Sequence, residues 1–163
     1  MALGDNTTAA ARGSDSRGRQ PYMVQTVVDY ATALADKGSA LAANDIIPCI
    51  AVPAGTLILN AGIQVDTVAS SGTTTLDLGT AVDVDCFVDG FDADSGTAAG
   101  TFAIPAAAYN PLLAVAAETI DVKLATQSGT ALTTGKIRVY AILMDVTDTG
   151  VEGPDEVDRD YLA

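Results

Sequence analysis

The segment Thr56–Leu78, TLILNAGIQVDTVASSGTTTLDL, carries the strongest fold signal in this chain. Apolar and polar side chains alternate over residues 56–68, and they alternate again over 74–78, after Ser70-Ser71-Gly72. A period of two is typical of a β-strand with one face against a core. The apolar face of the first strand comprises Leu57, Leu59, Ala61, Ile63 and Val65, with Ile58 as an exception. Two such strands separated by a loop that contains glycine predict a β-hairpin.

Shorter segments with β character lie on both sides of this one. They are residues 22–30, 46–52, 86–88, 102–104, 120–124 and 139–146. Pro48 predicts an edge strand or a bulge, and the almost wholly apolar run 139–146 predicts a central strand that is covered on both faces. Residues 31–44 are rich in alanine but contain Gly38 and Ser39, which favours a loop over a helix. Seven or eight strands separated by turn signals predict an all-β antiparallel sandwich or barrel.

The composition divides the 163 residues into one domain and two tails. We expect a flexible N-terminal arm over residues 1–21, a β-domain over 22–147 and an acidic C-terminal tail over 148–163. The arm is polar and carries Arg12, Arg17 and Arg19, three of the eight cationic side chains of the chain. It is either a frayed terminus or a segment that orders on a partner. A basic arm on an acidic body favours the second interpretation.

The charge balance and the missing residue types exclude several classes of function. A net charge of −13 disfavours contact of the body with nucleic acid or with an anionic membrane surface. The chain contains no histidine, which excludes a Ser-His-Asp triad and a histidine-ligated zinc, and it contains none of the nucleotide-binding glycine motifs. We therefore expect no enzymatic activity. No secretory signal or membrane span is evident, so we expect synthesis in the cytoplasm.

Two further groups of side chains are candidate sites. Cys49 and Cys86 lie in apolar runs, which favours buried thiols, although the spacing leaves a disulfide open. The carboxylates between Asp83 and Asp94 form an acidic cluster that leaves a calcium site of another type open. Its end, Asp92–Gly96, resembles the start of an EF-hand calcium loop, but Gly96 and Ala103 stand where that loop needs oxygen ligands. We therefore expect acidic turns here, and neither a metal nor a cofactor.

The order of the segments resembles that of a known family of small proteins. The residues that carry the resemblance are Ile50–Val65, Gly72–Gly79, Asp83–Gly90, Thr119–Val122 and Gly135–Ile142. In this order they resemble capsid decoration (cement) proteins of tailed bacteriophages, cyanophages included, over about residues 22–147. The resemblance implies an eight-stranded jelly roll that sits as a homotrimer on the outer surface of the virion. Its partner would be the major capsid protein, whose neighbouring subunits it would bridge and stabilise.

No catalytic residue follows from this resemblance, and the expected site is a set of partner contacts. Arg12, Arg17 and Arg19 would reach an acidic surface of the shell or of a neighbouring copy, and Tyr22 and Met23 would anchor the base of the arm. Two other functions stay open. One is a receptor- or glycan-binding jelly roll of a phage tail or fibre, which predicts exposed loop aromatics such as Tyr109. The other is a small shell-forming subunit, for which three cations are few.

Overall fold

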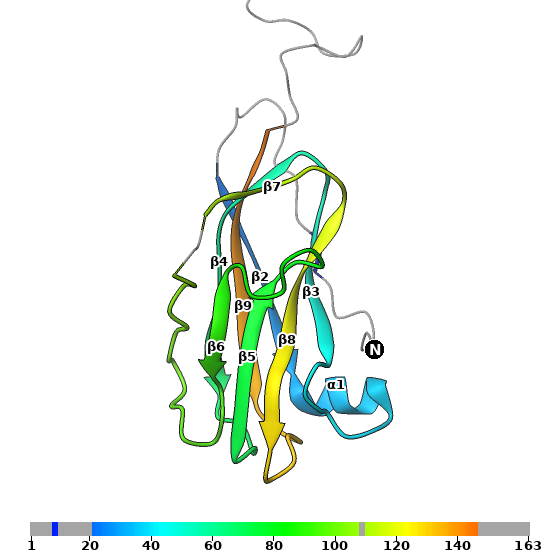
Figure 1. The fold of residues 1–163 in the computed structure, drawn as a ribbon, viewed down its shortest axis with the longest axis vertical. Coiled ribbons are helices and arrows are strands. Elements are labelled where there is room, and N and C mark those ends of the chain that lie inside the picture. The colour runs from blue at the N-terminus through cyan, green and yellow to red at the C-terminus, as the bar shows by residue number, and fades with distance from the viewer. Residues whose placement is uncertain (1–7, 10–20, 108–109, 147–163) are drawn as a thin grey trace, which may run out of the picture.

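The alternating segments fold into two β-sheets that pack face to face, with one short helix at one end (Figure 1). This computed structural model describes residues 8–9, 21–107 and 110–146. The strands are β1 (Thr8–Ala9), β2 (Tyr22–Asp29), β3 (Ile46–Val52), β4 (Thr56–Thr67), β5 (Thr73–Gly79), β6 (Val88–Asp92), β7 (Leu112–Ala114), β8 (Glu118–Ser128) and β9 (Lys136–Asp145), and the helix is α1 (Tyr30–Lys37). The predicted all-β class is confirmed.

The strands pair in a nested order. β2 pairs with β9, β3 with β8, β4 with β7 and β5 with β6, and every one of these pairs is antiparallel. The pairs are joined sideways into a five-stranded sheet, β1-β3-β8-β5-β6, and a four-stranded sheet, β2-β9-β4-β7. Among the strands of the described residues, only β1 runs parallel to its neighbour, β3. A long hairpin rolled into two sheets in this way is a jelly roll, which agrees with the predicted architecture.

The core lies between the two sheets and consists mainly of branched aliphatic side chains. Every second residue is buried from Ile120 to Leu124 in β8 and from Ile137 to Leu143 in β9, as expected for strands with one face against a core. Fully buried side chains include Ile47, Ile50, Ile58, Ile63, Leu76, Leu78, Ile120 and Leu124. Burial of each side chain of this size contributes roughly 1.5–3 kcal/mol, so the core is the main source of stability. In the described part of the chain, no helix is long and apolar enough to cross a membrane.

The predicted hairpin between residues 56–68 and 74–78 is wrong. β4 belongs to the four-stranded sheet and β5 to the other, so the connection between them crosses from sheet to sheet. Ser70, within this connection, is held by the loop between β8 and β9. Its Oγ accepts hydrogen bonds from the backbone N–H groups of Thr133 (2.9 Å) and Thr134 (3.1 Å). The Ser-Ser-Gly signal therefore marks a crossover that contacts this loop, where the sequence predicted a tight turn.

A bulge changes which side of β4 faces the core. The pairing with β9 shifts register between Ile58 and Asn60. Ile58 is therefore fully buried with Ala61 and Ile63, whereas Leu57 and Leu59 are only half-buried. Ile58, the exception in the predicted alternation, is a core residue. An extra residue in one strand changes which side chains of that strand face the core. The bulge predicted at Pro48 is confirmed, since β3 shifts register between Pro48 and Ile50.

Two smaller predictions also need correction. The brief strand expected at Phe102–Ile104 is reduced to a single bridge between Phe102 and Gln64. β9 does lie between two other strands, β2 and β4, but the described residues cover only one of its faces completely. The residues on its other face, among them Tyr140 and Ile142, stay half-buried.

The loop expected over residues 31–44 begins instead with the helix α1. The Asp29 carboxylate accepts a hydrogen bond from Ala31 N–H (2.9 Å), which caps the N-terminus of the helix. Gly38 adopts a φ of 68° after the last helical residue, and its N–H donates to the carbonyls of Leu34 and Ala35. This left-handed glycine ends the helix. Gly38 therefore marks a helix end, and the expectation that it prevents a helix was wrong.

We expect Asp29→Ala to lower the free energy of unfolding by about 1 kcal/mol, because it removes the helix cap. Asp29→Asn is the matched control, since asparagine caps equally well but cannot pair with Lys136, which lies 3.0 Å from Asp29.

The hydrogen bond from Lys136 and the cap lower the pKa of Asp29. The pair therefore stabilises the fold above the ordinary aspartate pKa of about 4 and is lost as the pH falls through the lowered value. Urea unfolding at pH 7 and pH 3 checks both points, and equal stabilities for the two variants at pH 7 would contradict the capping role.

Candidate interaction surfaces

The outer faces of the two sheets differ in chemistry. The five-stranded sheet presents polar groups to solvent. The hydroxyls of Thr75 and Thr126 lie 2.8 Å apart, and Lys123 pairs with Asp77 at 3.5 Å. An outer face of this kind is stable in water without a partner.

The outer face of the four-stranded sheet carries many apolar side chains over the half that contains β7, beside the polar Gln25 and Asn60, which the register places opposite Tyr140 and Ile142. We call this surface the apolar face, and its residues are Met23, Leu57, Phe102, Leu113, Tyr140, Ile142 and Met144. The register places Met23 opposite Ile142, and Leu57 opposite both Met144 and Leu113, so the side chains adjoin across all four strands. Met23 is 62% exposed, Phe102 55% and Leu113 45%. A contiguous exposed apolar surface is typical of an interaction site.

The centre of the apolar face is built around a glycine. The Tyr140 ring lies directly over Gly62, where any Cβ would clash with the ring. Phe102 packs edge-on against Tyr140, with 6.2 Å between the ring centroids. The two aromatic rings therefore form a structured patch, with Phe102 still more than half exposed.

Ion pairs bound the apolar face at the end near α1. Lys136 pairs with Asp29 at 3.0 Å and Arg138 pairs with Asp66 at 2.9 Å. Elsewhere, Lys37 pairs with Asp45, and Lys123 pairs with Asp77 on the other sheet. All four lysines and arginines in the described part of the chain are therefore engaged with aspartates.

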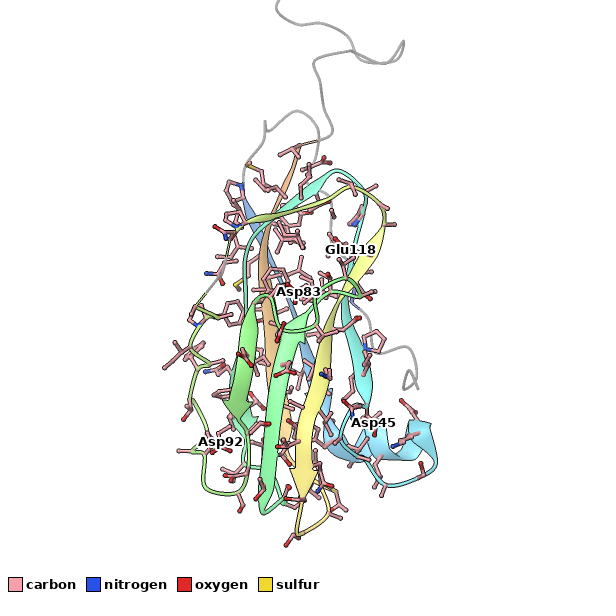
Figure 2. All side chains as sticks on the ribbon, in the orientation of Figure 1. Asp45, Asp83, Asp92 and Glu118 are labelled. Carbon is pink, nitrogen blue, oxygen red and sulfur yellow. The ribbon has the colours of Figure 1, made fainter. Side chains whose placement is uncertain are left out.

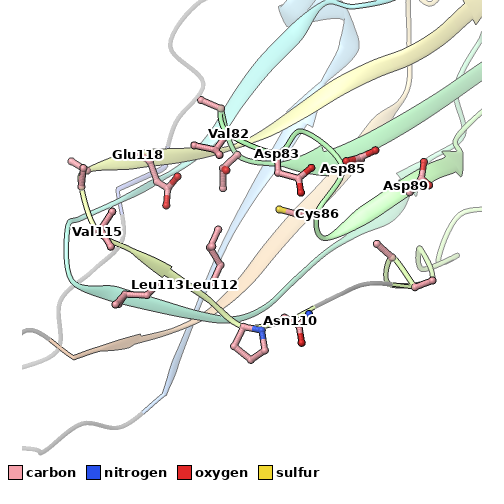
Figure 3. A pocket seen from close by; sticks show the side chains of 17 residues that line it. Val82, Asp83, Asp85, Cys86, Asp89, Asn110, Leu112, Leu113, Val115 and Glu118 are labelled. Atoms are coloured by element: carbon pink, nitrogen blue, oxygen red, sulfur yellow. The ribbon is translucent and has the colours of Figure 1, made fainter.

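A cleft of about 850 Å³ adjoins the apolar face at β7 (Figure 3). It lies between residues 80–86, which follow β5, and residues 110–118, which include β7. Figure 3 shows Val82 and Asp83 on one wall and Leu112 and Leu113 on the other. The lining is mostly apolar, and Val82 and Val115 are 92% and 84% exposed. Leu113 belongs to both surfaces and joins them.

Carboxylates surround this cleft without a counter-charge. Asp83, Asp85, Asp89 and Glu118 contribute to its lining, and no lysine or arginine is present among the described residues that form it. A hydrogen bond shared with Asp85 raises the pKa of Asp83. Burial, followed by the nearby Asp121 carboxylate, raises the pKa of Glu118. The negatively charged carboxylates around the cleft repel one another, so a cation would be bound favourably there.

The acidic segment between Asp83 and Asp94 does not converge on one point. Figure 2 shows Asp83 near Glu118 in the half that holds β7, whereas Asp92 lies in the other half with Asp45. Asp94 Oδ1 accepts a hydrogen bond from Gly96 N–H (2.6 Å), which is a local turn contact. No three potential metal-ligating side chains group together within the described residues.

The residues expected to bind a partner are placed as follows. Met23 belongs to the apolar face, and Tyr22 packs against the core. Arg12, Arg17 and Arg19 lie outside the described residues, as does Tyr109. The cleft and the aromatic patch were missed. The sequence signal for the apolar face was the almost wholly apolar run 139–146. Such a strand has apolar side chains on both sides, and the described residues cover only one of these sides completely.

The fold is shared with chains of two phage capsids. A chain in the capsid of Ralstonia phage GP4 superposes with a TM-score of 0.60 at 20% identity, over 85% of this chain and 92% of that one. A chain in the capsid asymmetric unit of cyanophage Pam1 gives 0.58 at 17% identity, over 83% and 91%. The sequence matches no protein-family model and no curated protein. At these identities the likeness establishes the fold.

The two cysteines are free thiols that we expect to differ in reactivity. Burial raises the pKa of Cys49, which is fully buried, to about 12, and it raises that of Cys86, which is half-buried in the cleft, to about 11. Both groups are protonated at neutral pH, so the thiolate fraction of Cys86 rises about tenfold per pH unit between pH 7 and 9. Alkylation of the folded protein should modify Cys86 alone, with a rate that follows this rise, and should modify Cys49 only after unfolding. Mass spectrometry with Cys86→Ser as control checks this, and early labelling of Cys49 contradicts it.

Proposed function

We propose that this chain is a non-enzymatic structural protein of a tailed-phage virion, which decorates the outer surface of the capsid. In this proposal, homotrimers bridge neighbouring subunits of the major capsid protein and are added after synthesis in the host cytoplasm. The observation that carries the proposal is the apolar face on the outside of the four-stranded sheet. It is a surface that a partner would cover, on a chain whose opposite face is suited to water.

The two outer faces suit a protein that sits on a shell. The polar face of the five-stranded sheet would point to solvent, where acidic groups favour solubility. The apolar face would be buried against protein, at roughly 25 cal/mol for each Å² of apolar surface removed from water. Each contact would be modest, but many equivalent copies would act on one shell, so the summed stabilisation against internal pressure would be large.

The two phage capsid chains that share this fold support a place in a phage virion. Both similar chains described above belong to phage capsids, and each is covered over nine-tenths of its length. A fold can host several functions, so this likeness is support by analogy. The surface chemistry favours a binding role for this chain, because the apolar face is a surface that a protein partner would cover.

We expect the double variant Met23→Glu, Phe102→Glu to bind purified shells at least tenfold more weakly than the parent chain. Two carboxylates would have to lose their hydration at the centre of the contact, which is unfavourable without a partner charge. The matched control is Thr73→Glu, Thr126→Glu, which adds the same charge to the exposed polar face. Co-sedimentation with decoration-free shells measures occupancy, and circular dichroism verifies the fold. Full occupancy by the Met23, Phe102 variant would refute the role of the apolar face.

We expect the purified protein to have a mass near 50 kDa by light scattering, three times the 16.5 kDa of one chain. Cyclic symmetry allows three copies to bury the same surfaces in a closed ring. A series of concentrations separates a stable trimer from a transient one. A mass of one chain at every concentration would contradict the trimer.

A further inference from the structure

We propose that the cleft between residues 80–86 and β7 binds the arginine-bearing segment 10–20 of a second copy of this chain. The inference deepens the proposed function, because it names the contact that holds copies together. It applies to copies in solution and needs no shell.

The first argument is charge. The cleft holds four carboxylates, from Asp83, Asp85, Asp89 and Glu118, and no cation among its described lining residues. The described lysines and arginines are already engaged elsewhere, each with an aspartate. The remaining cations of the chain are Arg12, Arg17 and Arg19 in the arm and Arg159 in the C-terminal tail.

The arm suits the cleft better than the C-terminal tail does. Around Arg159 the tail carries Asp148, Glu152, Asp155, Glu156, Asp158 and Asp160. A segment of that composition would be repelled by an acidic cleft. Segment 10–20 carries three arginines against one aspartate, Asp15. A guanidinium can bridge two neighbouring carboxylates such as Asp83 and Asp85, because its fork of donors matches their geometry.

The second argument is position. β1 and β2 flank segment 10–20, and β1 pairs with β3, whereas β2 contacts β3 from the opposite sheet. The segment therefore starts and ends at the side of the sandwich formed by these strands. The cleft involves β7 and the ends of β5 and β6, and β6 and β7 are the last strands of their sheets on the opposite side. β2 and β7 are three strand spacings apart, about 14 Å.

The eleven residues of segment 10–20 can span about 14 Å, so the distance alone permits a contact within one molecule as well. The placement on opposite sides of the sandwich suits a head-to-tail contact between copies, and the test below distinguishes the two. An arm on one side of the molecule and its receptor on the other form a heterologous interface, which produces a ring when the rotation closes. Three copies related in this way would each donate one arm and accept one. The lining also suits an extended segment, because its apolar walls can pack the small residues Ala10 and Ala11 beside the arginines.

The test is a disulfide between two different molecules. One protein carries Ser14→Cys in the arm, the other carries Val82→Cys at the rim of the cleft, and both carry Cys86→Ser. Cys49 is fully buried, so we expect that it does not react in the folded protein. An affinity tag on one protein gives the mixed dimer its own mobility on a non-reducing gel after mild oxidation with diamide. The matched control replaces Val82→Cys with Val27→Cys. Val27 is an exposed side chain of β2, at the opposite side of the sandwich.

We expect the mixed dimer to form at least tenfold faster with Val82→Cys than with Val27→Cys. Adding Asp83→Lys and Asp85→Lys to the cleft protein, or raising the salt to 1 M, should remove this advantage, because charge attraction brings the arm to the cleft. Equal rates for the two positions would overturn the inference. So would a bond within one molecule when Ser14→Cys and Val82→Cys are combined in a single chain.

The outcome separates this inference from the proposed function. If the mixed dimer fails to form while the parent chain binds shells, the cleft inference is wrong and the decoration role stands. If the dimer forms while shells are not bound, the copies associate as inferred and the decoration role is wrong.

Discussion

The pairing of β9 with both β2 and β4 is the contact on which the rest of the structure depends. β9 joins β2 to β4 in the four-stranded sheet, and its buried residues form part of one wall of the core. The same strand carries Tyr140, Ile142 and Met144 on its other side. Because side chains alternate along a strand, an apolar run in β9 must supply both the core and the outer face. The apolar face is therefore a consequence of how this strand is built.

The sequence predicted what depends on local alternation and missed what depends on pairing. The strand character of β4 and β8 follows from the period of their side chains, and that of β9 from its almost wholly apolar run. The hairpin between β4 and β5 failed because the Ser70 region contacts Thr133 and Thr134, which lie far along the chain. The bulge after Ile58 reverses the alternation and is visible only through the partner strand. The helix α1 was missed because Gly38 was weighed as an interruption, although a glycine of this kind commonly ends a helix.

The candidate surfaces could be predicted only in part. Met23 was expected at a partner contact, and it lies on the apolar face, where that contact stays a prediction. The cleft could not be foreseen, since it brings residues 80–86 next to 110–118 from separate parts of the chain. Its acidic character was visible in composition but not in position. The arginines of the arm, which we infer to be its counter-charge in a second copy, lie outside the described residues.

A chain with one polar face, one apolar face and an acidic cleft fits a role in an assembly better than a role alone. Electron cryomicroscopy of the virus particle tests this most directly. The account predicts density for the sandwich on the outside of the shell, between neighbouring capsid subunits, with the four-stranded sheet buried and the five-stranded sheet toward solvent. Density confined to the tail or fibres, or a four-stranded sheet fully exposed on the shell, would contradict it.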